Sequence, residues 1–210
     1  MKLKTDQKIF LVRHGRSIWN GRKIISGQLN PPLSDEGLNQ AKCLAEVLRG
    51  ENIAEIHTSS LSRTIETARP TADFHGLSII EHDDLREINF GVLQGRFRDE
   101  RDTEAQTMWA EREIDKENFR IPNGETFAEL ESRIDTFLKK ILEINETILI
   151  VGHRSANRMI LRRLMNWTRE TAVSLKLRSK YLYEISNVKN TTQINTIQIC
   201  GGAKFAGYKE

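Results

Sequence analysis

Three observations predict an α/β fold for this chain, a three-layer αβα sandwich with a mostly parallel central sheet. Two short apolar runs, residues 9–12 and 146–151, are typical of buried strands. Amphipathic helical patterns separate the strand patterns along the chain, and that alternation favours a parallel sheet covered on both faces. Each apolar run also ends in a histidine, at the strand ends where such sheets bind their ligands.

The individual elements follow from local signals. Ser34 is expected to cap a helix because its hydroxyl can accept an amide hydrogen bond, with Asp35 and Glu36 complementing the helix dipole. Pro70 lacks an amide hydrogen, so the helix around it is expected to be broken or kinked. The expected elements after the first strand are helix 34–50, strand 53–58, helix 61–75, strand 77–80, helices 99–117 and 125–143, strand 146–151, helix 155–165, and edge strands 181–186 and 192–199.

The chain is interpreted as one domain over residues 1–210, with a charged helical insertion at roughly 90–122. The insertion buries few apolar side chains and is expected above the carboxyl ends of the strands, where loops commonly set substrate selectivity. The amphipathic stripe of 125–143, in contrast, is interpreted as core packing.

Composition limits the classes of function. The chain has 210 residues, 38% hydrophobic and 29% charged, which is enough for a soluble domain with a sizeable core. Its net charge of +3 is too small, and its basic residues too scattered, to indicate nucleic acid as a partner. No apolar run is long enough to span a membrane, and residues 1–8 are too polar for a signal peptide. We therefore expect a cytoplasmic protein with no membrane partner; oligomeric state is left open.

The two cysteines, Cys43 and Cys200, have no spacing typical of a disulfide framework or a structural zinc site. Cys43 lies in an amphipathic helical pattern and is expected to be a buried or half-buried thiol. No cluster of acidic residues and histidines has the spacing of metal ligands. The sequence therefore predicts a site without metal or cofactor.

The strand ends carry the chemistry. The first run ends in Arg13-His14-Gly15 and the second in Gly152-His153. Arg13 supplies planar donors that suit phosphate oxygens. Gly15, which has no Cβ, would let the backbone approach a bound group. A neutral imidazole can attack phosphorus through a free nitrogen lone pair. From the residues alone, either histidine can be that nucleophile.

Five motifs carry a resemblance to a known family. They are Arg13-His14-Gly15, residues 29–41, residues 59–68 with Arg63, Leu85-Arg86-Glu87 with Gly91, and Val151-Gly152-His153. With these motifs in order over roughly residues 9–165, the chain resembles the histidine phosphatase superfamily, the phosphoglycerate-mutase-like group. The resemblance implies a phosphatase or phosphotransferase that works through a phosphohistidine.

The resemblance also implies the roles of individual residues. His14 would be the nucleophile, with His153, Arg13 and Arg63 contacting the phosphoryl group. Glu87 would be the proton donor, although Asp83 and Asp84 compete for that role in the sequence. Further residues match positions that contact the substrate in relatives: Asn20 and Gln28 at the phosphate, and Arg112, Lys116 and Arg158 at a second phosphate.

Departures from the family patterns bear on the substrate. Mutases carry Arg-His-Tyr-Gly where this chain has residues 88–91, and a longer insertion, which favours a hydrolase here. The pattern is most similar to the fructose-2,6-bisphosphatase branch, but Arg98 and Phe127 replace tyrosines and Arg154 replaces a glutamine. Arg98 and Arg154 are expected to contact an anionic group arranged differently.

Three functions follow as expectations. The first is hydrolysis of a small phosphorylated metabolite, such as a sugar phosphate or a phosphoglycerate-like compound, with no cofactor. The second is a phosphoglycerate-mutase-like phosphotransferase, which would share the pocket but shield the phosphoenzyme from water. The third is a non-catalytic module that binds a phosphorylated ligand.

Overall fold

The computed structural model describes residues 1, 3–5 and 7–210; Lys2 and Asp6, from the polar N-terminal stretch, lie outside the described residues. A seven-stranded sheet with strand order β3-β2-β4-β1-β5-β6-β7 forms the centre. Its strands are β1 (Lys8–Arg13), β2 (Ile53–Ser59), β3 (Ile79–His82), β4 (Thr147–Gly152), β5 (Tyr181–Val188), β6 (Thr191–Gln198) and β7 (Lys204–Ala206).

The sheet is parallel in one part and antiparallel in the other. β3, β2, β4 and β1 run parallel, whereas β5, β6 and β7 add in antiparallel order. In the register of β1 with β4, Arg13 lies opposite Gly152. His14 and His153 therefore leave the sheet side by side, and the His14 amide donates to the Gly152 carbonyl at 2.9 Å. The register of β1 with β4 thus places the two histidines next to each other at the carboxyl ends of the parallel strands.

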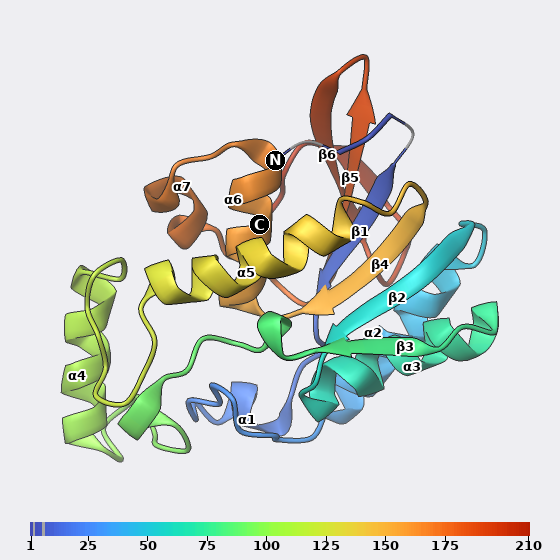
Figure 1. Ribbon diagram of the computed structural model, residues 1–210. Coiled ribbons are helices and arrows are strands. Elements are labelled where there is room, and N and C mark those ends of the chain that lie inside the picture. The colour runs from blue at the N-terminus through green and yellow to red at the C-terminus, as the bar shows by residue number, and fades with distance from the viewer. Residues whose placement is uncertain (2, 6) are drawn as a thin grey trace.

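Helices cover both faces of the sheet (Figure 1), so the three-layer α/β prediction is confirmed. The helices, with short 3₁₀ turns, are α1 (Ile18–Gly21), α2 (Asp35–Leu48), α3 (Ser62–His75), η1 (Asp83–Leu85), η2 (Gly91–Leu93), α4 (Thr103–Ile114), α5 (Phe127–Ile141), α6 (Arg154–Met165) and α7 (Arg169–Ser174). α2 and α3 pack on one face, and α5 and α6 pack on the other.

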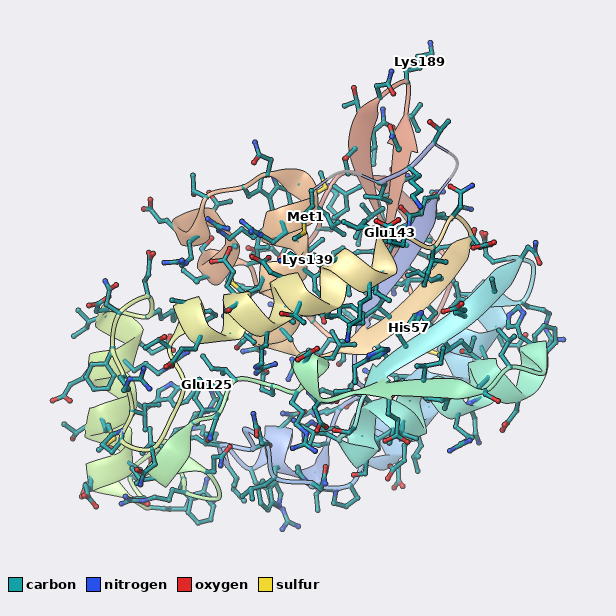
Figure 2. All side chains as sticks on the ribbon, viewed as in Figure 1. Met1, His57, Glu125, Lys139, Glu143 and Lys189 are labelled. Carbon is teal, nitrogen blue, oxygen red and sulfur yellow. A yellow bond between two sulfur atoms is a disulfide. The ribbon has the colours of Figure 1, made fainter. Side chains whose placement is uncertain are left out.

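Alternation along the strands produces two cores. On β1, Ile9 and Leu11 point to the α5–α6 side, while Phe10 and Val12 point to the α2–α3 side. Side chains of a strand alternate between the faces, so a fully apolar run indicates a sheet covered on both sides. On α5 the apolar stripe is buried as expected, and Lys139 lies on its exposed face (Figure 2).

Several expectations about elements were wrong. α3 is one continuous helix through Pro70 rather than a broken one. β5 and β6 are interior strands, because the short β7 pairs beyond β6 and forms the sheet edge. Short elements such as α1, α7 and β7 were not expected, because they carry too little periodicity to stand out from loops.

The cysteines form a disulfide, which corrects the expectation of a thiol at Cys43. Cys43 lies on α2 and Cys200 follows β6, with a Cα–Cα distance of 5.2 Å and a sequence separation of 157 residues. Chain spacing carries no signal for such a pair, since its proximity comes from the packing of α2 beside the sheet.

The charged insertion extends past one end of α5, with α4 as its helix (Figure 1). Gly91 begins η2 with a φ of +48°, and a Cβ there would approach the Pro122 carbonyl oxygen to 2.0 Å. The two ends of the insertion are therefore in close backbone contact, a packing that glycine permits. Among the described residues, no helix combines the length and the apolar character needed to cross a membrane.

Candidate active site

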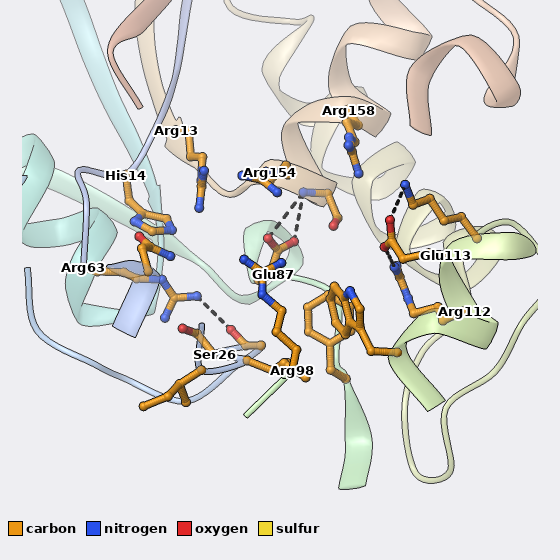
Figure 3. Close-up of a pocket in the computed structure, with 18 residues that line it drawn as sticks. Arg13, His14, Ser26, Arg63, Glu87, Arg98, Arg112, Glu113, Arg154 and Arg158 are labelled. Atoms are coloured by element: carbon orange, nitrogen blue, oxygen red, sulfur yellow. Dashed lines mark hydrogen bonds and ion pairs between the residues drawn. The ribbon is translucent and has the colours of Figure 1, made fainter. Parts of the chain in front are cut away.

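A cavity of about 170 Å³ lies at the carboxyl ends of the parallel strands. It is walled by the strand-end loops, the start of α6 and the insertion (Figure 3). Most of the expected site residues line it together: Arg13, His14, Asn20, Arg63, Glu87, Arg98, Arg112, Lys116, Arg154 and Arg158. The fold therefore gathers residues from widely separated chain segments into one polar cavity.

His14 has one ring nitrogen bonded to backbone. Its Nδ1 lies 2.7 Å from the Gly15 carbonyl oxygen, which accepts only a hydrogen bond, so Nδ1 carries the proton. Burial, together with the nearby Arg63 and Arg13 guanidinium groups, holds the His14 pKa well below its usual range. The ring is therefore neutral, and its Nε2 lone pair is left without a proton.

His153 has both ring nitrogens engaged. Nδ1 accepts from the Arg63 guanidinium at 3.1 Å, and Nε2 lies 2.7 Å from the Ser59 hydroxyl. The ring is fully buried, with its centroid 5.1 Å from that of His14. Burial and the Arg63 charge hold the His153 pKa well below its usual range. The two histidines, equivalent in sequence context, thus differ in hydrogen bonding.

Three guanidinium groups lie deep in the cavity wall. Arg63 donates to the Leu29 and Gly27 carbonyl oxygens at 2.6 and 2.8 Å. Within the described part of the chain, the buried Nε atoms of Arg13, Arg63 and Arg154 have no hydrogen-bond partner. Burial, followed by the Arg154 charge, lowers the pKa of Arg13 to about 9. These cations are crowded and poorly solvated, which favours an anion between them.

Glu87 faces the same cavity from the loop after η1. Its carboxylate accepts hydrogen bonds from the Ser155 and Ile88 amides, each at 3.0 Å. Its backbone carbonyl accepts from Arg133 at 3.1 Å and from the Gln28 side chain at 3.0 Å. Both the backbone and the carboxylate are therefore held in place, with the carboxylate at the start of α6.

Gln28 and His153 stand behind the cavity wall. Each contacts a lining residue, Glu87 and Arg63 respectively, but neither is among the residues that line the cavity. Asp83, a competitor for the proton-donor role, pairs instead with Arg86 at 2.8 Å on the exposed side of η1.

The structure shows a packing role for Gly15. A Cβ at Gly15 would approach the Gly37 carbonyl oxygen of α2 to 2.6 Å. The missing side chain lets the strand-end loop pack closely against α2; close approach of this backbone to a bound group stays a prediction.

Sequence reasoning missed several residues at the site. Glu113 lies in the cavity wall, 2.7 Å from the Lys116 amine and 3.4 Å from Arg112. Lys116 follows Glu113 by three residues, just past the end of α4, and this short spacing is a local signal for the pair. Trp109 also lines the cavity, with the Arg98 guanidinium 5.7 Å from its ring centroid. The contacts of Arg133 and Ser155 with Glu87 join segments that are distant in sequence, so no local signal could find them.

Comparison with known proteins defines the family. The model of the histidine phosphatase superfamily (branch 1) matches residues 9–199. This chain belongs to that superfamily. Curated relatives named "Probable phosphoglycerate mutase GpmB", from Yersinia pestis and Yersinia pseudotuberculosis, are 35% identical over 175 residues, covering 82% of this chain and 81% of each relative.

Solved structures share the fold. The alpha-ribazole phosphatase from Shigella flexneri superposes with a TM-score of 0.81 at 22% identity, covering 97% of this chain and 100% of that one. A mycobacterial glucosyl-3-phosphoglycerate phosphatase superposes with a TM-score of 0.76 at 21% identity, covering 90% and 96% of the two chains. At these identities the structures support the fold of this superfamily member and leave its substrate open.

Proposed function

We propose that this protein hydrolyses phosphomonoesters of small metabolites through a phosphohistidine on His14. The observation that carries the proposal is the difference between the two histidines. His14 is neutral, with Nδ1 bonded to the Gly15 carbonyl and Nε2 available, whereas both nitrogens of His153 have partners. A nucleophile needs an unprotonated nitrogen, and His14 provides it.

In the first step, His14 Nε2 attacks phosphorus. The N–P bond forms as the bond from phosphorus to the ester oxygen breaks, and Glu87 gives its proton to the departing oxygen. The proton on Nδ1 of His14 stays on that nitrogen, and its hydrogen bond to the Gly15 carbonyl oxygen orients the ring. General acid catalysis of this kind contributes about 10²- to 10⁴-fold for a poor leaving group.

In the second step, Glu87 takes a proton from water as the water oxygen attacks phosphorus. The N–P bond breaks, inorganic phosphate leaves, and His14 regains its lone pair. The same carboxyl group serves both steps because water enters on the side from which the alcohol has departed. The amide donors of Ile88 and Ser155 keep that carboxylate in position between steps.

The cations stabilise the transferring phosphoryl group. Arg13 and Arg63 bring fixed positive charge to its oxygens, as phosphoryl transfer requires. A bound phosphate that competes for the Arg63 guanidinium would release Nδ1 of His153, which then becomes protonated and donates to the phosphate. Asn20, also in the wall, adds a neutral polar contact.

The substrate that suits this cavity is a small, anionic, phosphorylated metabolite, such as a sugar phosphate or a phosphoglycerate-like compound. The cavity is small, and Arg98, Arg112, Lys116 and Arg158 surround the space beyond the phosphate. Phe90 and Trp109 supply the apolar part of that wall. These residues would contact the alcohol portion of the substrate.

Release of inorganic phosphate from a panel of phosphorylated metabolites tests this function. Rapid quenching with ³²P-labelled substrate should trap label that is stable to base and labile to acid. The proposal fails if the wild-type protein releases phosphate from no substrate in the panel, or if label is trapped on another residue.

A phosphoglycerate-mutase-like phosphotransferase is the second candidate, and the names of the 35%-identical relatives favour it. The same residues would transfer the phosphoryl group to an acceptor alcohol in place of water. Comparing phosphate release with conversion of 3-phosphoglycerate to 2-phosphoglycerate separates the two reactions. A non-catalytic ligand-binding module is disfavoured, because His14, Glu87, Arg13 and Arg63 all line the cavity.

A further inference from the structure

A second hollow of about 280 Å³ adjoins the catalytic cavity. The two hollows share Arg13, Asn20, Arg98 and Arg154, so a molecule bound at His14 can extend into the second one. The outer walls of this hollow come from the start of α2 and from the loop that precedes β5. That loop contributes Arg178, Ser179 and Lys180. We call this second space the outer hollow.

The outer hollow carries an excess of uncompensated positive charge. Its single acidic residue, Glu36, accepts hydrogen bonds from Arg16 at 2.8 Å and Gln40 at 3.3 Å, so its charge is already used. Within residues 1, 3–5 and 7–210, ion pairs are absent for the remaining cations, which are Arg13, Arg98, Arg154, Arg178 and Lys180. Five cations without an ion pair among the described residues therefore line one space, and its one carboxylate, Glu36, already pairs with Arg16.

The buried members point to a ligand. The Nε atoms of Arg13 and Arg154 are buried without a partner among the described residues. Leaving a buried charged donor unsatisfied is costly, and the usual compensation is a bound anion. Arg13 contacts the transferring phosphate. Arg154, the first residue of α6, lies two residues after the end of β4 and lines both hollows, so it can connect the first phosphate to a second anionic group.

On the side of the catalytic cavity that faces the insertion, the cations already have partners, unlike those of the outer hollow. Glu113 pairs with Lys116 and Arg112. The Arg112 guanidinium also lies 5.0 Å from the Phe90 ring and 5.5 Å from the Phe127 ring, which fixes it among aromatic side chains. Arg158 donates through Nε and Nη2 to the Leu175 carbonyl. A second anion on this side would have to displace contacts that already exist.

We propose that the outer hollow binds a second anionic group of the substrate, a phosphate or a carboxylate, through Arg154 and Arg178. The substrate then runs from His14 toward the loop before β5, and Arg98 and Lys180 add charge at the rim. This inference rests on the proposed function for the position of the first phosphate. It names the substrate class as a compact phosphomonoester with a second anionic group.

Three esters with the same three-carbon leaving group test the inference: propyl phosphate, propane-1,3-diol bisphosphate and 3-(phosphonooxy)propanoate. Propyl phosphate carries no second anion, propane-1,3-diol bisphosphate carries a second phosphate, and 3-(phosphonooxy)propanoate carries a carboxylate. We expect the wild-type protein to show a higher kcat/KM for at least one bis-anionic ester than for propyl phosphate. The ester preferred identifies which anion the hollow accepts.

Arg178→Gln removes the rim guanidinium from an exposed loop, where the fold should tolerate the change. We expect the ratio of kcat/KM for the preferred bis-anionic ester to that for propyl phosphate to fall about 10- to 100-fold, the usual effect of losing a charge-assisted hydrogen bond. The loss should appear in KM. Arg178→Glu should lower the ratio further, because it adds repulsion.

Lys176→Gln is the matched control. It removes one positive charge two residues away, from a side chain that pairs with Glu210 at 3.0 Å and lines neither hollow. We expect the ratio to stay unchanged. Equal falls in Arg178→Gln and Lys176→Gln would show a general field effect and overturn the proposal, as would an unchanged ratio in Arg178→Glu.

Direct binding separates this inference from the proposed function. Isothermal titration calorimetry compares the affinities of propane-1,3-bisphosphonate and propylphosphonate, neither of which can be hydrolysed. The difference between the two affinities measures the contribution of the second anionic group without turnover. Tighter binding of the bisphosphonate that is lost in Arg178→Gln supports the outer hollow even if no ester is hydrolysed. Equal affinity for the two compounds overturns it even if hydrolysis is fast.

Discussion

The cations at the strand ends and the cations of the insertion line one cavity but differ in how their charge is balanced. Arg13 is the last residue of β1 and Arg154 lies two residues after β4, and neither has an ion pair among the described residues. Arg112 and Lys116 lie on or just after α4, and both pair with Glu113. Glu113, the carboxylate partner of Arg112 and Lys116, is their neighbour in sequence. Arg13 and Arg154, in contrast, come from separate chain segments and have no carboxylate neighbour of this kind among the described ion pairs.

This difference separates cations that are available to a ligand from cations that hold structure. Gathering Arg13, Arg63 and Arg154 at buried strand ends costs folding free energy, as their lowered pKa values indicate. A bound phosphate neutralises part of this positive charge, so the free energy of repulsion that is relieved contributes to phosphate affinity. A cation that already has a carboxylate partner must break a contact before it can bind, so it contributes less affinity.

The strand-end residue with the largest expected effect is His14. His14→Ala should lower turnover by at least about 10⁴-fold and remove the trapped phosphoenzyme, because it removes the Nε2 lone pair that attacks phosphorus, whereas both ring nitrogens of His153 are hydrogen-bonded. Quenched-flow labelling and phosphate release measure both. His75→Ala, at the end of α3, is the control and should behave like wild type. Acid-labile, base-stable label on His14→Ala would refute the assignment.

Glu87→Gln should slow hydrolysis of an alkyl phosphate about 10²- to 10⁴-fold, because the amide keeps the shape of the acid without an exchangeable proton. The defect should shrink for 4-nitrophenyl phosphate, whose leaving group needs little protonation. Comparing kcat on the two esters measures the effect. Asp84→Asn, a competitor by sequence, is the control. An equal defect on both esters would assign Glu87 a structural role.

Arg13→Gln and Lys116→Gln compare the two groups of cations directly. Arg13→Gln should lower kcat/KM for propyl phosphate about 10²- to 10³-fold, since it removes an unpaired donor from the phosphoryl group. It should also raise Tm, because it relieves charge repulsion. Lys116→Gln should change kcat/KM less than about threefold, the modest effect expected of a paired charge. Similar losses in the two variants would erase the distinction.

The charge around His14 also predicts a pH dependence. His14 and His153 have lowered pKa values in the folded protein, so both stay neutral at pH values where the unfolded chain, with its ordinary histidine pKa, takes up protons. Their contribution to stability is therefore complete above about pH 6.5 and declines as pH falls below it.

NMR titration of the imidazoles and urea unfolding at several pH values test this dependence. We expect no protonation of His14 near pH 6.5, and a free energy of unfolding that decreases below that pH. Arg13→Gln should raise the pKa of His14 toward its usual range. Titration of His14 at pH 6.5 in the wild-type protein would contradict the assigned charge environment.

Chelation is expected to have no effect. Arginine charge at the strand ends takes the place of a metal ion, and no group of three His, Cys, Asp or Glu side chains in the described part of the chain is placed to hold one. Phosphate release should continue in excess EDTA. Loss of activity that added Mg²⁺ or Zn²⁺ restores would show that the strand-end cations are insufficient.

Much of the fold could be predicted from local pattern. Fully apolar runs such as 9–12 indicated a sheet covered on both faces, and the stripe of α5 indicated its buried side. Local signals failed for α7 and β7, which are too short to show a period. At Pro70 the sequence allowed a broken or a kinked helix, and the structure has an unbroken one.

The features of the candidate site also fall into those that the sequence predicted and those that depend on tertiary structure. The sequence by itself determined that Arg13, His14 and His153 end buried strands, because strand burial and residue type are local properties. Only the tertiary structure decided that His14 keeps a free nitrogen while His153 is bonded to Arg63 and Ser59. It also decided that Arg154 and Arg178 face one hollow and that Cys43 meets Cys200. The physical reason is that protonation, ion pairing and cross-linking depend on distances between groups, and those distances exist only once remote segments have packed together.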